Sequence, residues 1–239
     1  MTAYHWTSIG LFAAFALLEA IAAARPFPHV PRWRLKRLAF TLLYFAIATF
    51  APLAWDSFLG RYQLLDATDL PLVVQVGVGF IALQLGIYVW HRSMHRSEVL
   101  WRVFHQTHHS AERVDLWGAF YFHPLDMIGW AFIGSLALVL GIGISGEAGF
   151  IVAVFATALA MFQHSNLSTP RWIGFFVVRP ESHAVHHERG VHAFNYCDFP
   201  LIDMIFGTFR NPREWKEEAG FYDGASGHLG RLLTFRKFI

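Results

Sequence analysis

PLVVQVGVGFIALQLGIYVWHRSMH (71–95) joins a long apolar stretch directly to the first two histidines of a larger set. Residues 71–90 are long and apolar enough to cross about 30 Å of hydrocarbon as a helix. His91 and His95 are four residues apart, so they lie on one face if that helix continues beyond the membrane. The stretch therefore predicts a histidine site at the end of a membrane-spanning helix.

Two further clusters, HQTHH (105–109) and HAVHH (183–187), repeat helical spacing with histidines at i, i+3 and i+4. We expect each cluster to direct its imidazoles at a common point. Imidazole is a good ligand for iron, zinc, copper and nickel. Eight such rings exceed the three or four ligands of one zinc site, so the number predicts two metal ions. The eight are His91, His95, His105, His108, His109, His183, His186 and His187.

The composition is that of a membrane protein. Hydrophobic residues make up 55% of the 239 residues and charged residues only 15%, whereas soluble domains carry about 25% charged residues. We predict an all-α fold, a bundle of about five transmembrane helices with a cytoplasmic helical cap that holds the dimetal site, in a single domain over residues 1–239. The predicted spans are 8–24, 38–55, 71–90, 127–144 and 147–164.

The positive charges predict an orientation. With five spans, residues 25–37, 91–126 and 165–239 share one side of the membrane, and every Lys and Arg except Arg61 lies there. The positive-inside rule places that side, with all three histidine clusters, in the cytoplasm. The net charge of +2 and the absence of a basic stripe with stacking aromatics argue against a nucleic-acid partner.

The remaining histidines give weaker signals. His164 ends the last predicted span on the same side as the clusters and is predicted to be a ninth ligand. His123 fits a ligand, a residue that orients a ligand, or a helix cap, whereas His192 fits an orienting or structural role. His187-Glu188 with His192 resembles the zinc-protease motif HExxH, but its spacing is HExxxH, so the motif positions no glutamate as general base.

These motifs together resemble the fatty acid hydroxylase/sterol desaturase superfamily of integral-membrane di-iron enzymes. The resemblance covers roughly residues 70–210. Its one departure is Cys197, where many relatives have glycine. The matching segments are WHRSMH (90–95), FHQTHHS (104–110), FHP (122–124), FQHSN (162–166), HAVHH (183–187) and NYCDFPLIDMIFGTF (195–209).

The resemblance implies O₂-dependent hydroxylation or desaturation of a lipid taken from the bilayer. It implies two iron ions held by the eight clustered histidines and His164. Asn195 and Asp203 are then expected to orient ligand imidazoles through their second nitrogen. The choice between hydroxylation and desaturation stays open, as does the lipid: sterol-like polycycles, acyl chains, carotenoids and ether lipids all fit.

An external electron donor is expected. The sequence contains a single cysteine, no haem-binding segment and no dinucleotide fingerprint. A reductase, a small redox protein or a pterin would therefore supply the electrons. The compact chain resembles bacterial members, which favours a bacterial inner membrane over the endoplasmic reticulum. Two other functions stay open: a zinc-dependent membrane hydrolase, and a non-catalytic metal-binding membrane protein.

Overall fold

A computed structural model describes residues 3–215 and 218–238, and over these residues every regular element is a helix. This confirms the predicted all-α class. The α-helices are α1 (Ala3–Ala22), α2 (Trp33–Phe50), α3 (Asp56–Leu59), α4 (Leu72–Arg96), α5 (Glu98–Leu100), α6 (Gln106–His109), α7 (Pro124–Ser135), α8 (Gly146–His164), α9 (Pro180–His186), α10 (Pro200–Ile205) and α11 (Leu229–Leu232). Two π-helical segments, Trp101–His105 and Leu136–Ile142, continue α5 and α7.

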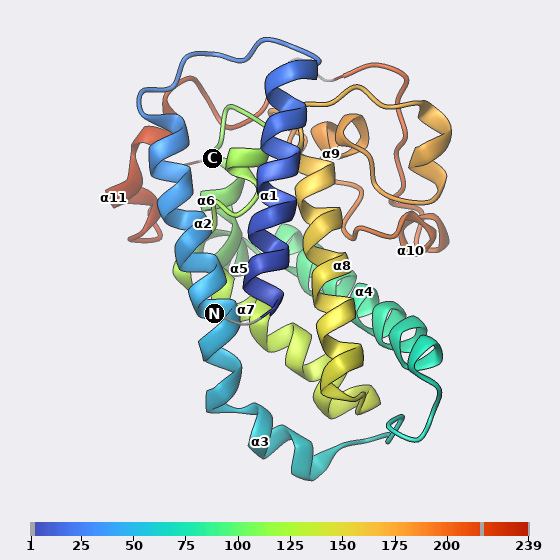
Figure 1. Ribbon diagram of the computed structural model, residues 1–239. Coiled ribbons are helices and arrows are strands. Elements are labelled where there is room, and N and C mark those ends of the chain that lie inside the picture. The colour runs from blue at the N-terminus through green and yellow to red at the C-terminus, as the bar shows by residue number, and fades with distance from the viewer. Residues whose placement is uncertain (1–2, 216–217, 239) are drawn as a thin grey trace.

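Four helical segments of the described chain are long and apolar enough to cross a membrane: Trp33–Ala54, Leu72–Arg96, Pro124–Ile142 and Gly146–His164. They correspond to four of the five predicted spans. The other, α1, has a shorter apolar stretch from Trp6 to Ala22, and the first turn of this helix lies about half-way along the bundle (Figure 1). The fifth span therefore stays a prediction.

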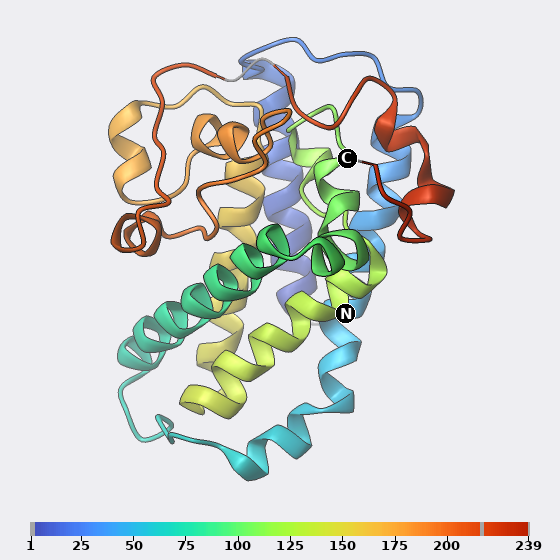
Figure 2. The same ribbon diagram turned by 180° about the vertical axis from the view of Figure 1, so that it is seen from behind.

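The long helices bring their histidine-bearing ends to the same end of the molecule. α4 packs against α7 and α8, α2 against α7, and α1 against α8. α4 crosses the bundle obliquely, and its C-terminal end reaches the layer of short helices and loops that covers the upper end (Figure 2). This layer, which we call the cap, contains α5, α6, α9, α10 and α11 (Figure 1).

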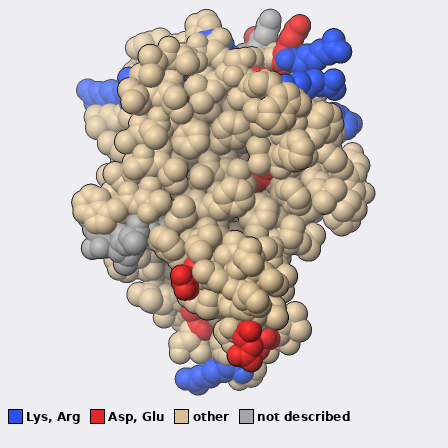
Figure 3. Space-filling model, turned by 45° about the vertical axis from the view of Figure 1, so that its right-hand side comes forward, with Lys and Arg blue, Asp and Glu red and all other residues tan. Residues whose placement is uncertain are grey.

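The positive charges are concentrated at the cap end of the bundle. On the face shown in Figure 3, Lys and Arg gather mainly at the cap end, and Asp and Glu lie mainly towards the opposite end. Uncharged side chains cover the region between them, and large apolar residues such as Leu42, Val73 and Val89 are exposed. An exposed apolar belt between two charged ends is what a bilayer solvates.

Glu19 fastens α1 to the rest of the bundle. Its Oε1 accepts a hydrogen bond from the backbone N–H of Leu116 at 2.8 Å and from that of Asn166 at 2.6 Å. Both donor residues are buried. One carboxylate oxygen thus joins the end of α1 to the loop before α7 and to the end of α8.

Glu19→Leu should lower the free energy of unfolding in detergent micelles by about 2–4 kcal/mol, because two buried N–H groups lose their acceptor. Glu19→Gln keeps an amide oxygen at the same place and should lose far less. Denaturant titration of the native protein and both variants measures the difference. Equal stability of the native protein and Glu19→Leu would show that these two hydrogen bonds are dispensable.

Candidate metal centre

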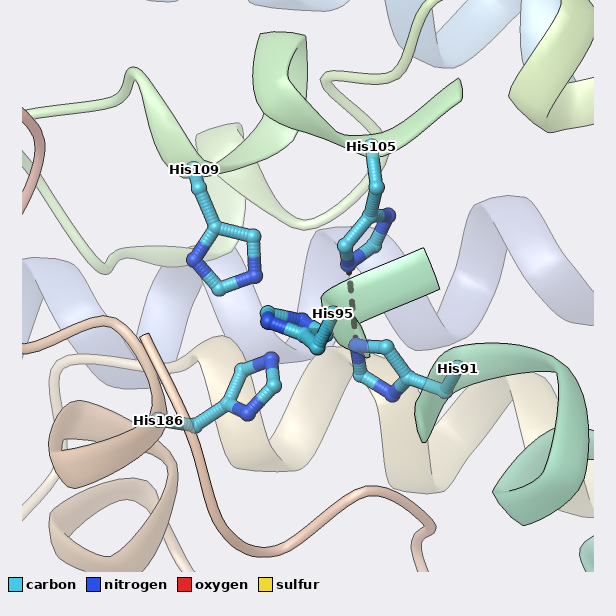
Figure 4. A group of neighbouring side chains, drawn as sticks. All are labelled: His91, His95, His105, His109 and His186. Carbon is cyan, nitrogen blue, oxygen red and sulfur yellow. Dashed lines mark hydrogen bonds between the residues drawn. The ribbon is translucent and has the colours of Figure 1, made fainter. Parts of the chain in front are cut away.

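The nine histidines predicted as ligands lie together in two adjacent groups. The ligand nitrogens of each group lie within 4.8 Å of one another. Five rings point towards a shared space in the first group (Figure 4). The five-histidine group contains His91, His95, His105, His109 and His186; the four-histidine group contains His108, His164, His183 and His187.

The two clusters with i, i+3 and i+4 spacing divide between the groups, so the expectation that each cluster aims at one point is wrong. His105 and His109 join one group and His108 the other. Likewise His183 and His187 stay together, while His186 lies in the opposite group. The reason is helical geometry: the i+3 and i+4 positions differ by about 100° around the axis. Each segment therefore presents histidines to both groups.

Local sequence explains how these segments are placed. α4 continues past its apolar stretch, which carries His91 and His95 into the cap. The next segment turns through the π-helical residues Trp101–His105, and π-turns of this kind are frequent at functional sites. α9 begins at Pro180. Proline suits this position because an N–H in the first turn of a helix has no acceptor within the helix, so its absence costs nothing.

Hydrogen bonds fix the proton on four of the nine rings. His91, His164 and His186 donate from Nδ1 to backbone carbonyls, which only accept, and His105 donates from Nδ1 to the Asp126 carboxyl group in its ionised form. In each case Nε2 keeps a lone pair. The bonds run from His91 to the Tyr196 carbonyl (2.7 Å), from His105 to the Asp126 carboxylate (2.8 Å), from His164 to the Ala160 carbonyl (2.8 Å) and from His186 to the Phe194 carbonyl (2.7 Å).

This proton assignment leaves two lone pairs facing each other in the five-histidine group. The Nε2 atoms of His91 and His105 are 2.9 Å apart, the contact drawn as a dashed line in Figure 4. Both rings have their single proton on Nδ1, so neither Nε2 can donate to the other. The arrangement is repulsive unless a cation binds both nitrogens. The residues present therefore fit a metal ion here.

The four-histidine group fits a second ion. Its Nε2 atoms follow one another in the order His108, His164, His183 and His187, at 3.1, 3.0 and 3.1 Å. For metal–nitrogen bonds of about 2.1 Å, as imidazole makes with zinc, ligands at right angles are about 3.0 Å apart. The spacing is thus that of neighbouring ligands around one ion.

The rings in the cap are neutral and available as ligands. Burial lowers the pKa of His105, His108 and His109 well below the usual histidine range. The same holds for the pKa of each histidine in the 183–187 cluster. Several buried nitrogens also have no hydrogen-bond partner, among them Nε2 of His109 and His186. Neutral imidazole is the form that binds metal.

His123 and His192 lie outside both groups. His123 precedes α7 and its Nδ1 accepts from the backbone N–H of Leu125 at 3.1 Å, so of its three expected roles it takes the helix cap. The Nδ1 of His192 lies 3.2 Å from Nδ1 of His109. His192 therefore contacts the His109 ring at Nδ1, which leaves Nε2 of His109 without a partner, as expected for a residue that orients a ligand ring.

Asn195 and Asp203 do not hydrogen-bond an imidazole, contrary to expectation. Asp203 accepts from the backbone N–H groups of Tyr196 (2.9 Å) and Cys197 (3.2 Å). It therefore holds the peptide whose carbonyl accepts from His91. Asn195 donates to the carbonyls of Ser182 and Arg210 and accepts from the N–H of Arg210. Both residues brace a loop that orients the rings.

That loop has an unusual backbone. Phe194 and Asn195 have φ of 73° and 48°, a region that bulky residues such as Phe rarely adopt. In this conformation two backbone carbonyls accept hydrogen bonds from histidine rings. The Phe194 carbonyl accepts from His186, and the Tyr196 carbonyl accepts from His91. Backbone strain of this kind persists only where surrounding bonds hold it. The three hydrogen bonds of Asn195 provide that restraint.

Asp126 is a functional residue that sequence reasoning missed. It is fully buried in α7 and accepts from Nδ1 of His105 at 2.8 Å. Carboxylates behind ligand histidines fix the tautomer and make the ring more basic. The available signal was an acid three residues after His123 in an otherwise apolar hairpin, where ionisable residues are costly and usually functional.

An apolar cavity of about 540 Å³ leads away from the histidines into the bundle. Rings of both groups, including His91 and His183, line one end, and Leu138, Ile144 and Phe150 line the other. Small-molecule binding sites are cavities of roughly 300–1,000 Å³ that are mostly apolar with a few polar groups. The cavity is suited to an extended hydrocarbon chain with its end at the histidines.

Several curated proteins are similar to this chain. Sphinganine C4-monooxygenase 1 of Arabidopsis thaliana is 29% identical over 157 residues, which are 64% of this chain and 60% of the relative. Ornithine lipid hydroxylase of Rhizobium tropici is 27% identical over 146 residues, 59% of this chain and 44% of the relative. Alkylglycerol monooxygenase of Homo sapiens is 31% identical over 150 residues, 56% of this chain and 30% of the relative.

This chain thus spans 30 to 60% of the length of these three relatives. No solved structure is a significant match. The family model described as fatty acid hydroxylase matches residues 76–208, which is more than half of the chain and includes all nine histidines of the two groups. On that match, the chain belongs to the fatty acid hydroxylase family.

Proposed function

We propose that this protein is an oxidoreductase that uses O₂ to hydroxylate or desaturate a membrane lipid at a di-iron centre. The observation that carries the proposal is the convergence of nine histidines in two groups, with the Nε2 atoms of His91 and His105 only 2.9 Å apart. Family membership favours iron, and the names of the relatives describe lipid hydroxylases and monooxygenases.

The five-histidine group would hold one iron and the four-histidine group the other. Bound in this way, the two irons supply the chemistry that activates O₂ to take hydrogen from an unactivated C–H bond. The protein's own contribution is positional: the carbonyls and Asp126 fix the ring orientations before metal binds. Because all nine ligands would be neutral imidazoles, they would not offset the positive charge of the two metal ions, as carboxylate ligands would.

The cavity would bind the substrate. Its apolar walls would accept a lipid chain and exclude water. Two of the lining residues pack against histidine rings, Trp130 against His105 and Phe122 against His108. Electrons would come from a separate donor in the aqueous phase, namely a reductase, a small redox protein or a pterin. We infer that the cap faces the cytoplasm, because it carries most of the basic residues. The membrane that we propose is a bacterial inner membrane.

Metal analysis tests this proposal. Purified protein should contain about two irons per chain, because each group offers a full set of ligands. His164→Ala removes one ligand of the four-histidine group and should lose iron from that group only, to about one per chain. His228→Ala, an exposed histidine outside both groups, is the matched control. One zinc per chain without iron would instead support the hydrolase.

Asp126→Asn should weaken iron binding by about 10–100-fold, the usual effect of removing a carboxylate behind a ligand histidine. The amide keeps the size of the side chain but loses the charge that favours the Nδ1 proton of His105. Competition with a chelator measures the affinity. Asp69→Asn, an exposed residue of the 60–71 connection, is the control. Unchanged affinity would mean that Asp126 only packs in α7.

The proposed orientation predicts opposite locations for two reporter fusions. A reporter fused after residue 145, between α7 and α8, should lie outside the cytoplasm, and one fused after residue 212 should lie inside. The bundle places these positions at opposite ends. The reverse pattern would contradict a cytoplasmic cap.

A further inference from the structure

A buried carboxylate, Asp198, forms part of the cavity wall close to the histidines. Asp198 and Gln163 are among the residues that line the cavity, as are His91 and His164. Its Oδ1 accepts from Nε2 of Gln163 and its Oδ2 accepts from Nε2 of Gln84, each at 2.8 Å. Asp198 is only 6% exposed.

No Lys, Arg or His forms an ion pair with Asp198 within the part of the chain that the structure describes. Burial raises the pKa of the Asp198 carboxyl to about 6, and the two glutamine side chains oppose that rise. A buried carboxylate without a cation is costly. An ionised carboxylate can accept about four hydrogen bonds, and the two glutamines donate only two. The Asp198 carboxylate can therefore accept further hydrogen bonds from a ligand.

The position of Asp198 along the cavity is fixed by its partners. Gln163 directly precedes His164 at the end of α8. Gln84 lies on the same face of α4 as His91 and two turns earlier, which is roughly 10 Å along the helix. Beyond this point the cavity wall is formed largely by apolar residues of α7 and α8. The polar patch thus lies at the end where the proposed chemistry takes place.

We propose that Asp198, held by Gln84 and Gln163, binds the hydrogen-bond-donating head of the substrate, a hydroxyl or an ammonium group. The tail of the lipid then extends along the apolar part of the cavity. The oxidised carbon consequently lies near the polar head and not near the tail end. The inference about the oxidised carbon rests on the proposed function, whereas the binding role of Asp198 is tested without it.

A purely structural role makes a different prediction. The Oε1 of Gln84 accepts from the backbone N–H groups of Asp198 (2.9 Å) and Phe199 (3.2 Å), which ties the loop before α10 to α4. These bonds use the backbone of residue 198, so Asp198→Asn keeps them. The Asn amide also keeps an acceptor for Gln84, and the Gln163 side chain can rotate to accept from it. A loss of binding in Asp198→Asn would therefore report the loss of the negative charge and not the loss of the loop's hydrogen bonds.

The test uses the whole chain as purified in detergent micelles and three probes: hexadecylamine, 1-hexadecanol and hexadecane. Titration calorimetry at equal probe mole fractions gives their affinities. The amine or the alcohol should bind more tightly than hexadecane, and Asp198→Asn should weaken that binding by about tenfold, as for a lost charge-assisted hydrogen bond. The probe that loses more affinity identifies the head as ammonium or hydroxyl. Iron content should equal that of the native protein.

Asp69→Asn, at the exposed opposite end of the molecule, is the control and should bind all probes as the native protein does. Equal binding of all three probes, or unchanged binding by Asp198→Asn, overturns the proposal. Loss of amine or alcohol binding in Asp56→Asn alone, at the other end of the cavity, also overturns it. A failed iron analysis would reject the di-iron function and leave this binding result standing.

Discussion

The structure depends on one electrostatic constraint, the 2.9 Å approach of two imidazole nitrogens that both carry lone pairs. While Asp126 is ionised, His91 and His105 do not share a proton between their Nε2 atoms, because a carbonyl and a carboxylate accept from their Nδ1 atoms. A bound cation turns this repulsion into attraction. The surrounding protein holds the rings in position: α4 carries one ring, a π-turn carries the other, and Asp126 reaches across from α7.

The fold satisfies this constraint at the edge of an apolar bundle. α4 and α8 end with histidines at the cap, and α6 and α9 present rings to both groups because the i+3 and i+4 positions diverge by about 100°. The cavity begins at the same rings and runs between the helices that bear the exposed apolar belt. In the proposed function, lipid, metal and aqueous electron donor would meet where one side of the site is apolar and the other polar.

The sequence predicts the histidine site well because its information is local: helical spacing and apolar stretches place nine rings at one end of the bundle. It does not predict how the clusters divide, since that depends on where each helix axis runs. The carbonyls of Phe194 and Tyr196 have no sequence signal, because they depend on a loop with positive φ. The two glutamine hydrogen bonds to the Asp198 carboxylate join residues 114 and 35 positions apart, beyond any local pattern.

Comparative lipid analysis tests the central claim most directly. A strain lacking this gene is complemented with the native chain or with His91→Ala, which removes one of the two facing lone pairs. The account predicts that only the native chain restores a lipid one oxygen atom heavier, or two hydrogen atoms lighter, than the lipid that accumulates in its absence. The same lipid profile in both complemented strains, with both proteins present in the membrane, would contradict it.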